Sequence, residues 1–295
     1  MRIVITGGTG FLGTALVDRL RTAGHVASVL TRRPRKPGEV EWSPASPPAI
    51  LARALDGAEA VINLAGASIA QRWTMKHKRE LWESRVPLTR ALVEAIRNTA
   101  PAPRTFISGS AVGIYGDRGD EELTEKSATG NGFLASLGEA WEKEALAATT
   151  HTRVVLVRTA IVLDRKGGAL PQMALPFHFF AGGPIGSGRQ YVSWIHRDDW
   201  TSMVAWALTN TAVTGPLNAA APHPVTNREF TRTLGRVLRK PSVMPAPGFA
   251  LRVVLGEMSS LILESQRMLP AKACDLGFRF SHPQLESALR TIYAS

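Results

Sequence analysis

The chain has 295 residues, a formal net charge of +11 at pH 7 and a single cysteine, Cys274. One cysteine excludes an internal disulfide and a cysteine-rich metal site, and no apolar run has the length of a membrane-spanning helix. The basic residues are scattered, without the aromatic-interleaved stripe typical of nucleic-acid binding, so the positive charge favours small anionic ligands.

The remaining composition predicts a cytoplasmic globular protein. Hydrophobic residues make up 44% of the chain and charged residues 20%. A chain of this length can bury a sizeable core, and a lone cysteine fits a reducing compartment. Because Met1 leads directly into a predicted strand, we expect no signal peptide. We expect no metal ion, nucleic acid or membrane as a partner, and nothing in the sequence selects an oligomeric state.

The first thirteen residues predict a strand, a glycine turn and a helix. Ile3 to Ile5 is typical of a buried strand, and leucines four residues apart from Leu12 to Leu20 form one helix face. Gly7, Gly10 and Gly13 allow a tight turn, the approach of a pyrophosphate and close packing of helix on strand. Free N–H groups at the helix start would face the phosphates. We expect a dinucleotide site, rather than a purely structural turn, formed by Gly7, Thr9, Gly10, Phe11, Leu12 and Gly13.

The predicted second strand, His25 to Leu30, ends in Thr31, Arg32 and Arg33. In a dinucleotide-binding fold this position meets the adenosine ribose, where NAD-binding proteins usually place an acidic residue. The chain has two arginines and no acid there, which favours the 2′-phosphate of NADP(H). We expect these three residues to contact the cofactor; a surface loop with ordinary arginines is the alternative.

Two further predicted strands end in small or polar residues. Ala60 to Gly66 is a buried strand, and Thr105 to Ile107 leads into a serine. The carboxyl ends of parallel strands lie beside the cofactor in this kind of fold. We therefore expect cofactor contacts, with packing spacers as the alternative, at Asn63, Leu64, Ala65, Gly66 and Ser108.

Strands and helices alternate along the first part of the chain, which predicts a Rossmann-like α/β fold with a doubly wound parallel sheet. We assign residues 1–165 to an NADP(H)-binding domain, with a strand returning to the sheet near residues 215–220. We assign residues 166–295 to a smaller substrate-side lobe that covers the cofactor crevice. Its end, residues 245–295, contains helices after the proline-rich segment Pro241 to Pro247.

These motifs resemble a known family. The glycine turn, Asn63 to Gly66 and Ser110 with Tyr115-Gly116 are similar to the extended short-chain dehydrogenase/reductases. Other segments resemble one atypical branch, the "epimerase family" proteins described as NADP-binding oxidoreductases or nucleoside-diphosphate-sugar epimerases, which have their own small C-terminal domain. Those segments are Ser84-Arg85, Ser108 to Gly113, Trp141-Glu142, Ser193 to His196, Gly256-Glu257, Ser265 to Arg267, Pro270 and Gly277 to Phe280.

The chain departs from the superfamily at the residues that carry its chemistry. The resemblance implies a Tyr-x-x-x-Lys pair, in which tyrosine exchanges a proton and lysine lowers the tyrosine pKa. With Glu142 as the anchor, the matching positions hold Leu134 and Gly138, and no tyrosine lies between Tyr115 and Tyr191. We therefore predict that the usual acid/base pair is absent.

Two other residues could take part in catalysis. Ser110 matches the serine that the family uses to polarise a substrate oxygen; a strand-end hydroxyl bonded to the backbone is the alternative. His196 could shuttle protons near neutral pH, although a hydrogen-bonded structural histidine is the commoner case. For the substrate pocket, where core packing or ion pairs are the alternatives, the candidates are Arg85, Tyr115, Tyr191 and Trp194.

The sequence favours an atypical NADP(H)-dependent oxidoreductase that acts on a small substrate, which could be anionic. The alternative is a non-catalytic protein that binds NADP(H) and reports it to a partner. Nucleotide-sugar epimerisation has the least support, because it needs acid/base chemistry on two faces or reversible oxidation with the missing tyrosine.

Overall fold

A computed structural model describes residues 1–294; Ser295, the last residue of the predicted C-terminal region, lies outside them. Within the described chain, seven strands form one parallel sheet in the order β12-β7-β5-β4-β1-β2-β3. The direction of the strand order changes between β1 and β4, which is where ligands bind in open α/β sheets. The bounds are β1 (Arg2–Thr6), β2 (Val26–Thr31), β3 (Glu39–Glu41), β4 (Ala60–Asn63), β5 (Thr105–Ala111), β7 (Arg153–Thr159) and β12 (Gly215–Ala219).

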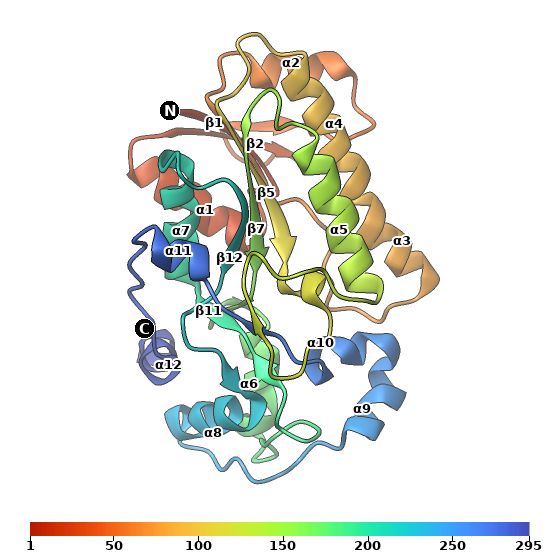
Figure 1. The fold of residues 1–295 in the computed structure, drawn as a ribbon, viewed down its shortest axis with the longest axis vertical. Coiled ribbons are helices and arrows are strands. Elements are labelled where there is room, and N and C mark those ends of the chain that lie inside the picture. Colours follow the sequence, from red (N-terminus) through yellow and green to blue (C-terminus); the bar gives the residue numbers. More distant parts are fainter. Residues whose placement is uncertain (295) are drawn as a thin grey trace.

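Helices cover both faces of this sheet, and the side chains of β1 alternate between them. Ile3 and Ile5 pack in the core under α1 (Phe11–Thr22) and α7 (Arg197–Thr209), whereas Val4 faces α2 (Pro48–Leu55), α4 (Val86–Arg97) and α5 (Phe133–Leu146). Figure 1 shows α4 and α5 on one side of the sheet and α1 and α7 on the other. The predicted Rossmann-like, doubly wound fold is confirmed. No helix within residues 1–294 combines the length and apolar character needed to cross a membrane.

The second part of the chain builds a smaller core of its own. Strands β8 (Ile161–Asp164), β9 (Gly167–Gly168) and β11 (Trp194–His196) form a three-stranded sheet. Trp194, Phe230 and Leu289 are buried among α6 (Leu170–His178), α8 (Asn227–Leu238) and α12 (Leu285–Ala294). In Figure 1 these elements lie below the large sheet, at the end to which its strands point.

The tail connects the two parts. Strand β14 (Arg267–Met268) pairs with β6 (Glu122–Leu123) in the loop after β5 and its short helix η1 (Val112–Tyr115). A run of short helices precedes β14, namely α9 (Gly248–Leu255), η2 (Gly256–Ser259) and α10 (Ser260–Leu263), and α11 (Ala271–Asp275) follows it. Lys78 on α3 (Met75–Glu83) forms an ion pair with Glu257, which ties the tail to the first part of the chain. One edge strand pair, β10 (Tyr191–Val192) with β13 (Val225–Thr226), completes the smaller lobe.

Candidate functional site

The glycine turn after β1 has no room for side chains at two positions. Gly7 has a φ of +71°, and a Cβ there would lie 2.5 Å from the Leu64 carbonyl. A Cβ on Gly13 would lie 2.1 Å from the Gly7 carbonyl oxygen, so α1 packs directly on the turn. Gly10 precedes α1 without a side-chain cap, and no acid stands in the first turn. The N–H groups at this helix start are therefore available to an anion.

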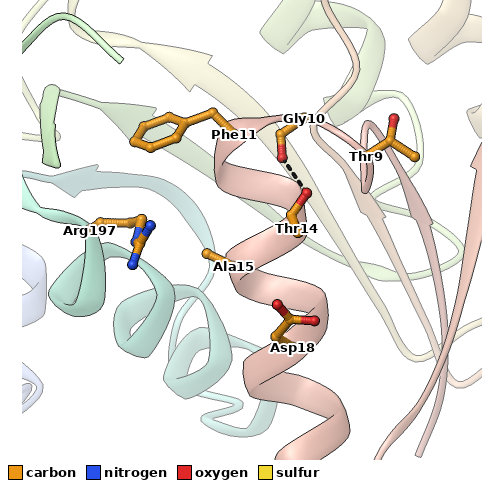
Figure 2. A pocket seen from close by; sticks show the side chains of 7 residues that line it. All are labelled: Thr9, Gly10, Phe11, Thr14, Ala15, Asp18 and Arg197. Carbon is orange, nitrogen blue, oxygen red and sulfur yellow. Dashed lines mark hydrogen bonds between the residues drawn. The ribbon is translucent and has the colours of Figure 1, made fainter. Parts of the chain in front are cut away.

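A pocket of about 330 Å³ lies beside this turn, on the outer side of α1 (Figure 2). Its wall from the first part of the chain includes Thr9, Thr14 and Asp18, and Arg197 approaches from α7. Arg197 is held by Asp164 at 3.0 Å. The ring of Phe11 points toward the smaller lobe, where a Cβ on Gly167 of β9 would lie 2.5 Å from its Cδ2. The smaller lobe thus closes on the start of α1.

The ends of β4 and β5 are closely packed against the glycine turn. Asn63 is fully buried; its Oδ1 accepts from Thr6 Oγ1 at 2.7 Å and its Nδ2 donates to Thr89 at 2.8 Å. Ser108 is also fully buried and donates to the Gly109 carbonyl. The Asn63 side chain therefore links β4 to β1 and to α4, and the Ser108 side chain bonds within its own strand β5. The residues from Leu64 to Gly66 form the accessible part of this edge.

The end of β2 lies beside the same turn, because Leu30 is opposite Thr6 in the sheet. Thr31 is half-buried, and Arg32 and Arg33 are exposed with no acidic partner among residues 1–294. The structure adds one residue that sequence reasoning missed: β3 places the exposed Glu41 opposite Thr31. Nothing local in the sequence signals this, because it depends on which strand pairs with β2.

A chain of buried hydrogen bonds lies behind the end of β5. Ser110 Oγ donates to Glu142 Oε1 at 2.6 Å, and both Glu142 oxygens accept from Arg158 at 2.8 Å. Arg158 also donates to the hydroxyl of Tyr115 at 2.9 Å, and that hydroxyl donates to Asn218 Oδ1 at 2.7 Å. Burial lowers the pKa of Arg158, but hydrogen bonding to Glu142 and its charge outweigh burial and raise it. Burial raises the pKa of Tyr115 against the opposing effect of Arg158.

This network decides how two predicted residues can act. The Ser110 hydroxyl hydrogen is used by Glu142, and Ser110 is only 4% exposed. Tyr115 is fully buried and belongs to the core instead of a pocket wall. Sequence reasoning treated Glu142 as an alignment anchor and missed its role as the partner of Ser110 and Arg158.

The helix face that holds Leu134 and Gly138 packs against η1. A Cβ built on Gly113 would lie 3.0 Å from Leu134 Cβ, and one on Gly138 would lie 3.1 Å from Ile114 Cβ. Apolar residues from both parts of the chain cover this region. Its buried members are Trp73, Leu81, Val86, Leu137 and Trp141, with Met258 and Leu261 of the tail packed on them.

Arg85 lies just outside this apolar cluster. It donates to the carbonyl oxygens of Leu81 at 3.2 Å and Ala67 at 2.9 Å, and its Cζ lies 5.3 Å from the ring centre of Trp141. A Cβ on Gly66 would lie 2.8 Å from that Cζ. Burial lowers the pKa of Arg85 to about 10. Arg85 is thus next to the accessible edge after β4.

The second-lobe candidates lie apart from Ser110. Trp194 is fully buried in the core of the smaller lobe and donates to the His223 carbonyl at 3.1 Å. Tyr191 is half-buried, with the guanidinium of Arg267 5.1 Å from its ring centre. None of the contacts made within residues 1–294 joins either residue to Ser110.

His196 caps a helix. Its Nδ1 accepts the backbone N–H of Asp198 at 3.1 Å at the start of α7, and its ring lies 3.9 Å from that of His282. Burial and the neighbouring charge of His282 lower the pKa of His196, against the opposing effect of Asp198. His196, Asp198 and His282 place possible metal-ligand atoms within 4.8 Å of one another. No spacing motif signals this group, because the fold brings His282 to it. Because His196 Nδ1 already accepts a hydrogen bond at the start of α7, we interpret this group as a structural contact and not as a metal site.

Comparison with known proteins agrees with this architecture. The NAD dependent epimerase/dehydratase family matches residues 3–220, and a domain of unknown function, DUF1731, matches residues 246–292. The epimerase family protein YfhF of Bacillus subtilis is 42% identical over 100% of this chain and 98% of its own length. A chloroplastic homologue of epimerase family protein SDR39U1 from Arabidopsis thaliana is 41% identical over 99% of this chain and 86% of its own length.

A crystal structure shows the same fold over its full length. Human epimerase family protein SDR39U1, crystallised with NADPH, superposes with a TM-score of 0.91 at 35% identity and 100% coverage of both chains. The resemblance to the epimerase family seen in the sequence is confirmed. The chain belongs to the NAD dependent epimerase/dehydratase family, and its C-terminal region matches the DUF1731 domain.

Proposed function

We propose that the protein binds NADP(H) and transfers a hydride to or from a small substrate without a Tyr–Lys pair. The observation that carries the proposal is the glycine turn, where the uncapped start of α1 leaves backbone N–H groups for a pyrophosphate. The space is adequate, because a Cβ added to Gly10 would find only the Gly7 oxygen nearby, at 3.3 Å. A human relative that crystallised with NADPH supports the same cofactor here.

The chain's own residues divide the work of binding. The N–H groups of Phe11, Leu12 and Gly13 hold the pyrophosphate, and Arg32 and Arg33 hold the 2′-phosphate. Neither arginine has an acidic partner within residues 1–294 to displace first. The residues after β4, from Leu64 to Gly66, support the cofactor next to the turn. When bound, NADPH supplies a hydride to the substrate carbon.

Neither of the two positions on α5 that match the family's tyrosine and lysine can transfer a proton. Leu134 and Gly138 have no titratable group, and their packing against η1 leaves no gap for a substrate between them. Ser110 orients the substrate oxygen either by accepting a hydrogen bond from it or by redirecting to it the hydroxyl hydrogen that Ser110 otherwise donates to Glu142, which Arg158 keeps in place. Water provides or takes the proton, because His196 is committed to capping α7.

A second function has one specific observation in its favour. Leu134, Gly138 and Ser110 are all engaged in packing or hydrogen bonds, while the cofactor half is open. This pattern fits a protein that binds NADP(H) without catalysis and reports it to a partner.

Isotope transfer separates the two functions. The protein is incubated with 4-deuterated NADPH, labelled on one face at a time, and a small-molecule extract of cells. Stereospecific loss of label that falls strongly in Ser110→Ala supports the oxidoreductase. Tight NADPH binding with full retention of label on both faces supports the sensor. Failure of the folded, cofactor-free protein to bind NADPH contradicts both.

A further inference from the structure

Arg85, Arg153 and Arg158 are buried or half-buried, and they differ in which acceptors their N–H groups contact. Arg153 makes four hydrogen bonds, three of them to carbonyl oxygens at the end of α7 and just after it. Arg158 is neutralised by Glu142. Arg85 is also drawn inward, but no carboxylate within residues 1–294 pairs with it.

The guanidinium of Arg85 retains unused donors. It has five N–H bonds, and three are used, by the Leu81 oxygen, the Ser84 hydroxyl and the Ala67 oxygen. The Nε–H and one Nη2 hydrogen have no acceptor in the described chain. Arg85 is half-buried, so part of the residue is accessible from outside.

The position of Arg85 in its helix adds positive potential. Arg85 is the N-cap residue of α4, which has a proline in its first turn, no side-chain cap and no acid there. The N-terminal end of a helix carries a partial positive charge, so a cation is ordinarily disfavoured there and an anion favoured. Arg85 therefore adds its charge to that of the helix start, and no acidic side chain in the first turn of α4 offsets either.

A second unused donor belongs to Trp141, whose ring centre lies 5.3 Å from Arg85 Cζ. The indole Nε1 of Trp141 is buried without a hydrogen-bond partner, and Trp141 is only 7% exposed. The six-membered ring of Trp141 packs on β5, where its Cη2 and Cζ2 lie 3.0 and 3.1 Å from a Cβ built on Gly109. A buried N–H without an acceptor is destabilising, and an acceptor on a ligand would recover that loss.

We propose that Arg85 and Trp141 form an anion site that takes the carboxylate or phosphate group of the substrate. This proposal rests on the function proposed above, because it assumes that the protein has a substrate. The cofactor's own phosphates are served by the start of α1 and by Arg32 and Arg33. Arg85 and Trp141 lie on the other side of β4, toward the end of β5, where a substrate would meet the nicotinamide half of the cofactor.

Inorganic phosphate tests the site in protein saturated with NADPH, so that the cofactor's phosphate positions are filled. Phosphate is titrated by calorimetry at constant ionic strength, with chloride as the exchanged anion. Wild type is expected to bind phosphate, and Arg85→Gln is expected to bind it at least tenfold more weakly. Trp141→Phe keeps the ring under the guanidinium and removes only the N–H, and a threefold or larger loss is expected. Arg232→Gln, at an exposed arginine on α8, is the control and is expected to bind phosphate as wild type does.

Arg85→Lys covers the case in which Arg85→Gln does not fold, because it retains the charge and loses the planar fork; intermediate binding is expected. Equal phosphate binding by wild type and the folded Arg85 variants would overturn the proposal. So would an equally large loss of NADPH affinity in these variants, which would assign the anion to the cofactor. If wild type fails to bind NADPH at all, the proposed function fails instead, and phosphate binding to Arg85 is then read without cofactor.

Discussion

Ser110 donates its hydroxyl hydrogen to Glu142, and the same carboxylate accepts two hydrogen bonds from the guanidinium of Arg158. The serine that aligns with a catalytic position is therefore one end of a buried ion-pair network. Its availability to a substrate depends on a nearly buried carboxylate, because Glu142 is only 6% exposed.

Removing Glu142 should destabilise the fold severely. Glu142→Ala would leave Arg158 buried without a counter-charge, and breaking a buried pair in this way costs about 3–5 kcal/mol of the free energy of unfolding. Ser110→Ala removes one hydrogen bond and should cost about 1 kcal/mol. Denaturant unfolding monitored by circular dichroism measures both.

Glu144 on the same helix provides the matched control. It pairs with the exposed Arg90, so Glu144→Ala should leave the denaturation midpoint almost unchanged. If Glu142→Ala and Glu144→Ala shift the midpoint equally, the Ser110–Glu142–Arg158 network does not have the energetic role assigned to it.

The cofactor preference should depend on the end of β2. Wild type is expected to bind NADPH at least tenfold more tightly than NADH, and Arg32→Ala should remove most of that preference while leaving NADH binding unchanged. A charge-assisted hydrogen bond contributes about 1.5–3 kcal/mol, which corresponds to roughly 10- to 100-fold. Fluorescence titration with each nucleotide gives the ratio.

A substitution at Glu41 tests the opposite change in charge at the end of β2. It lies opposite Thr31 in the pairing of β3 with β2 and brings an acidic side chain to the end of β2. Glu41→Gln should raise NADPH affinity modestly and leave NADH affinity unaffected, because only the 2′-phosphate is repelled. An NADH preference in wild type that weakens in Glu41→Gln would instead show that this acid recognises a ribose hydroxyl.

Restoring the missing pair should damage the protein without creating a classical site. Gly138→Lys places a Cβ 3.1 Å from Ile114 Cβ, so η1 must shift. Overpacking of this kind costs about 1–3 kcal/mol. Leu134→Tyr alone is the milder comparison, because it replaces a side chain that is already present. A Gly138→Lys variant with wild-type thermal stability would contradict the tight packing of α5 on η1.

The sequence was sufficient for features that are local in the chain. The strand, glycine turn and helix at residues 3–20 depend on neighbouring residues, and the alternation of strands and helices fixes a parallel sheet. The Glu142–Arg158 pair, Glu41 beside Thr31 and the unused donors at Arg85 and Trp141 depend on tertiary contacts. Trp194 is buried in the core of the smaller lobe, and no sequence motif predicts that core.

Acidification should weaken the fold through His196. Burial and the charge of His282 lower its pKa below the ordinary value of 6.5, and Asp198, Asp199 and Asp164 oppose this. The folded protein therefore binds a proton at His196 only at a lower pH than the unfolded chain, which binds one as the pH falls through about 6.5. The contribution of His196 is complete above that pH. Below that pH this contribution is lost, with a slope of at most about 1.4 kcal/mol per pH unit.

Denaturant unfolding from pH 5 to 8 should show this slope in wild type and a smaller one in His196→Gln. His151→Gln, at an exposed histidine, should retain the wild-type slope, and a His196→Gln profile parallel to wild type would contradict the assignment.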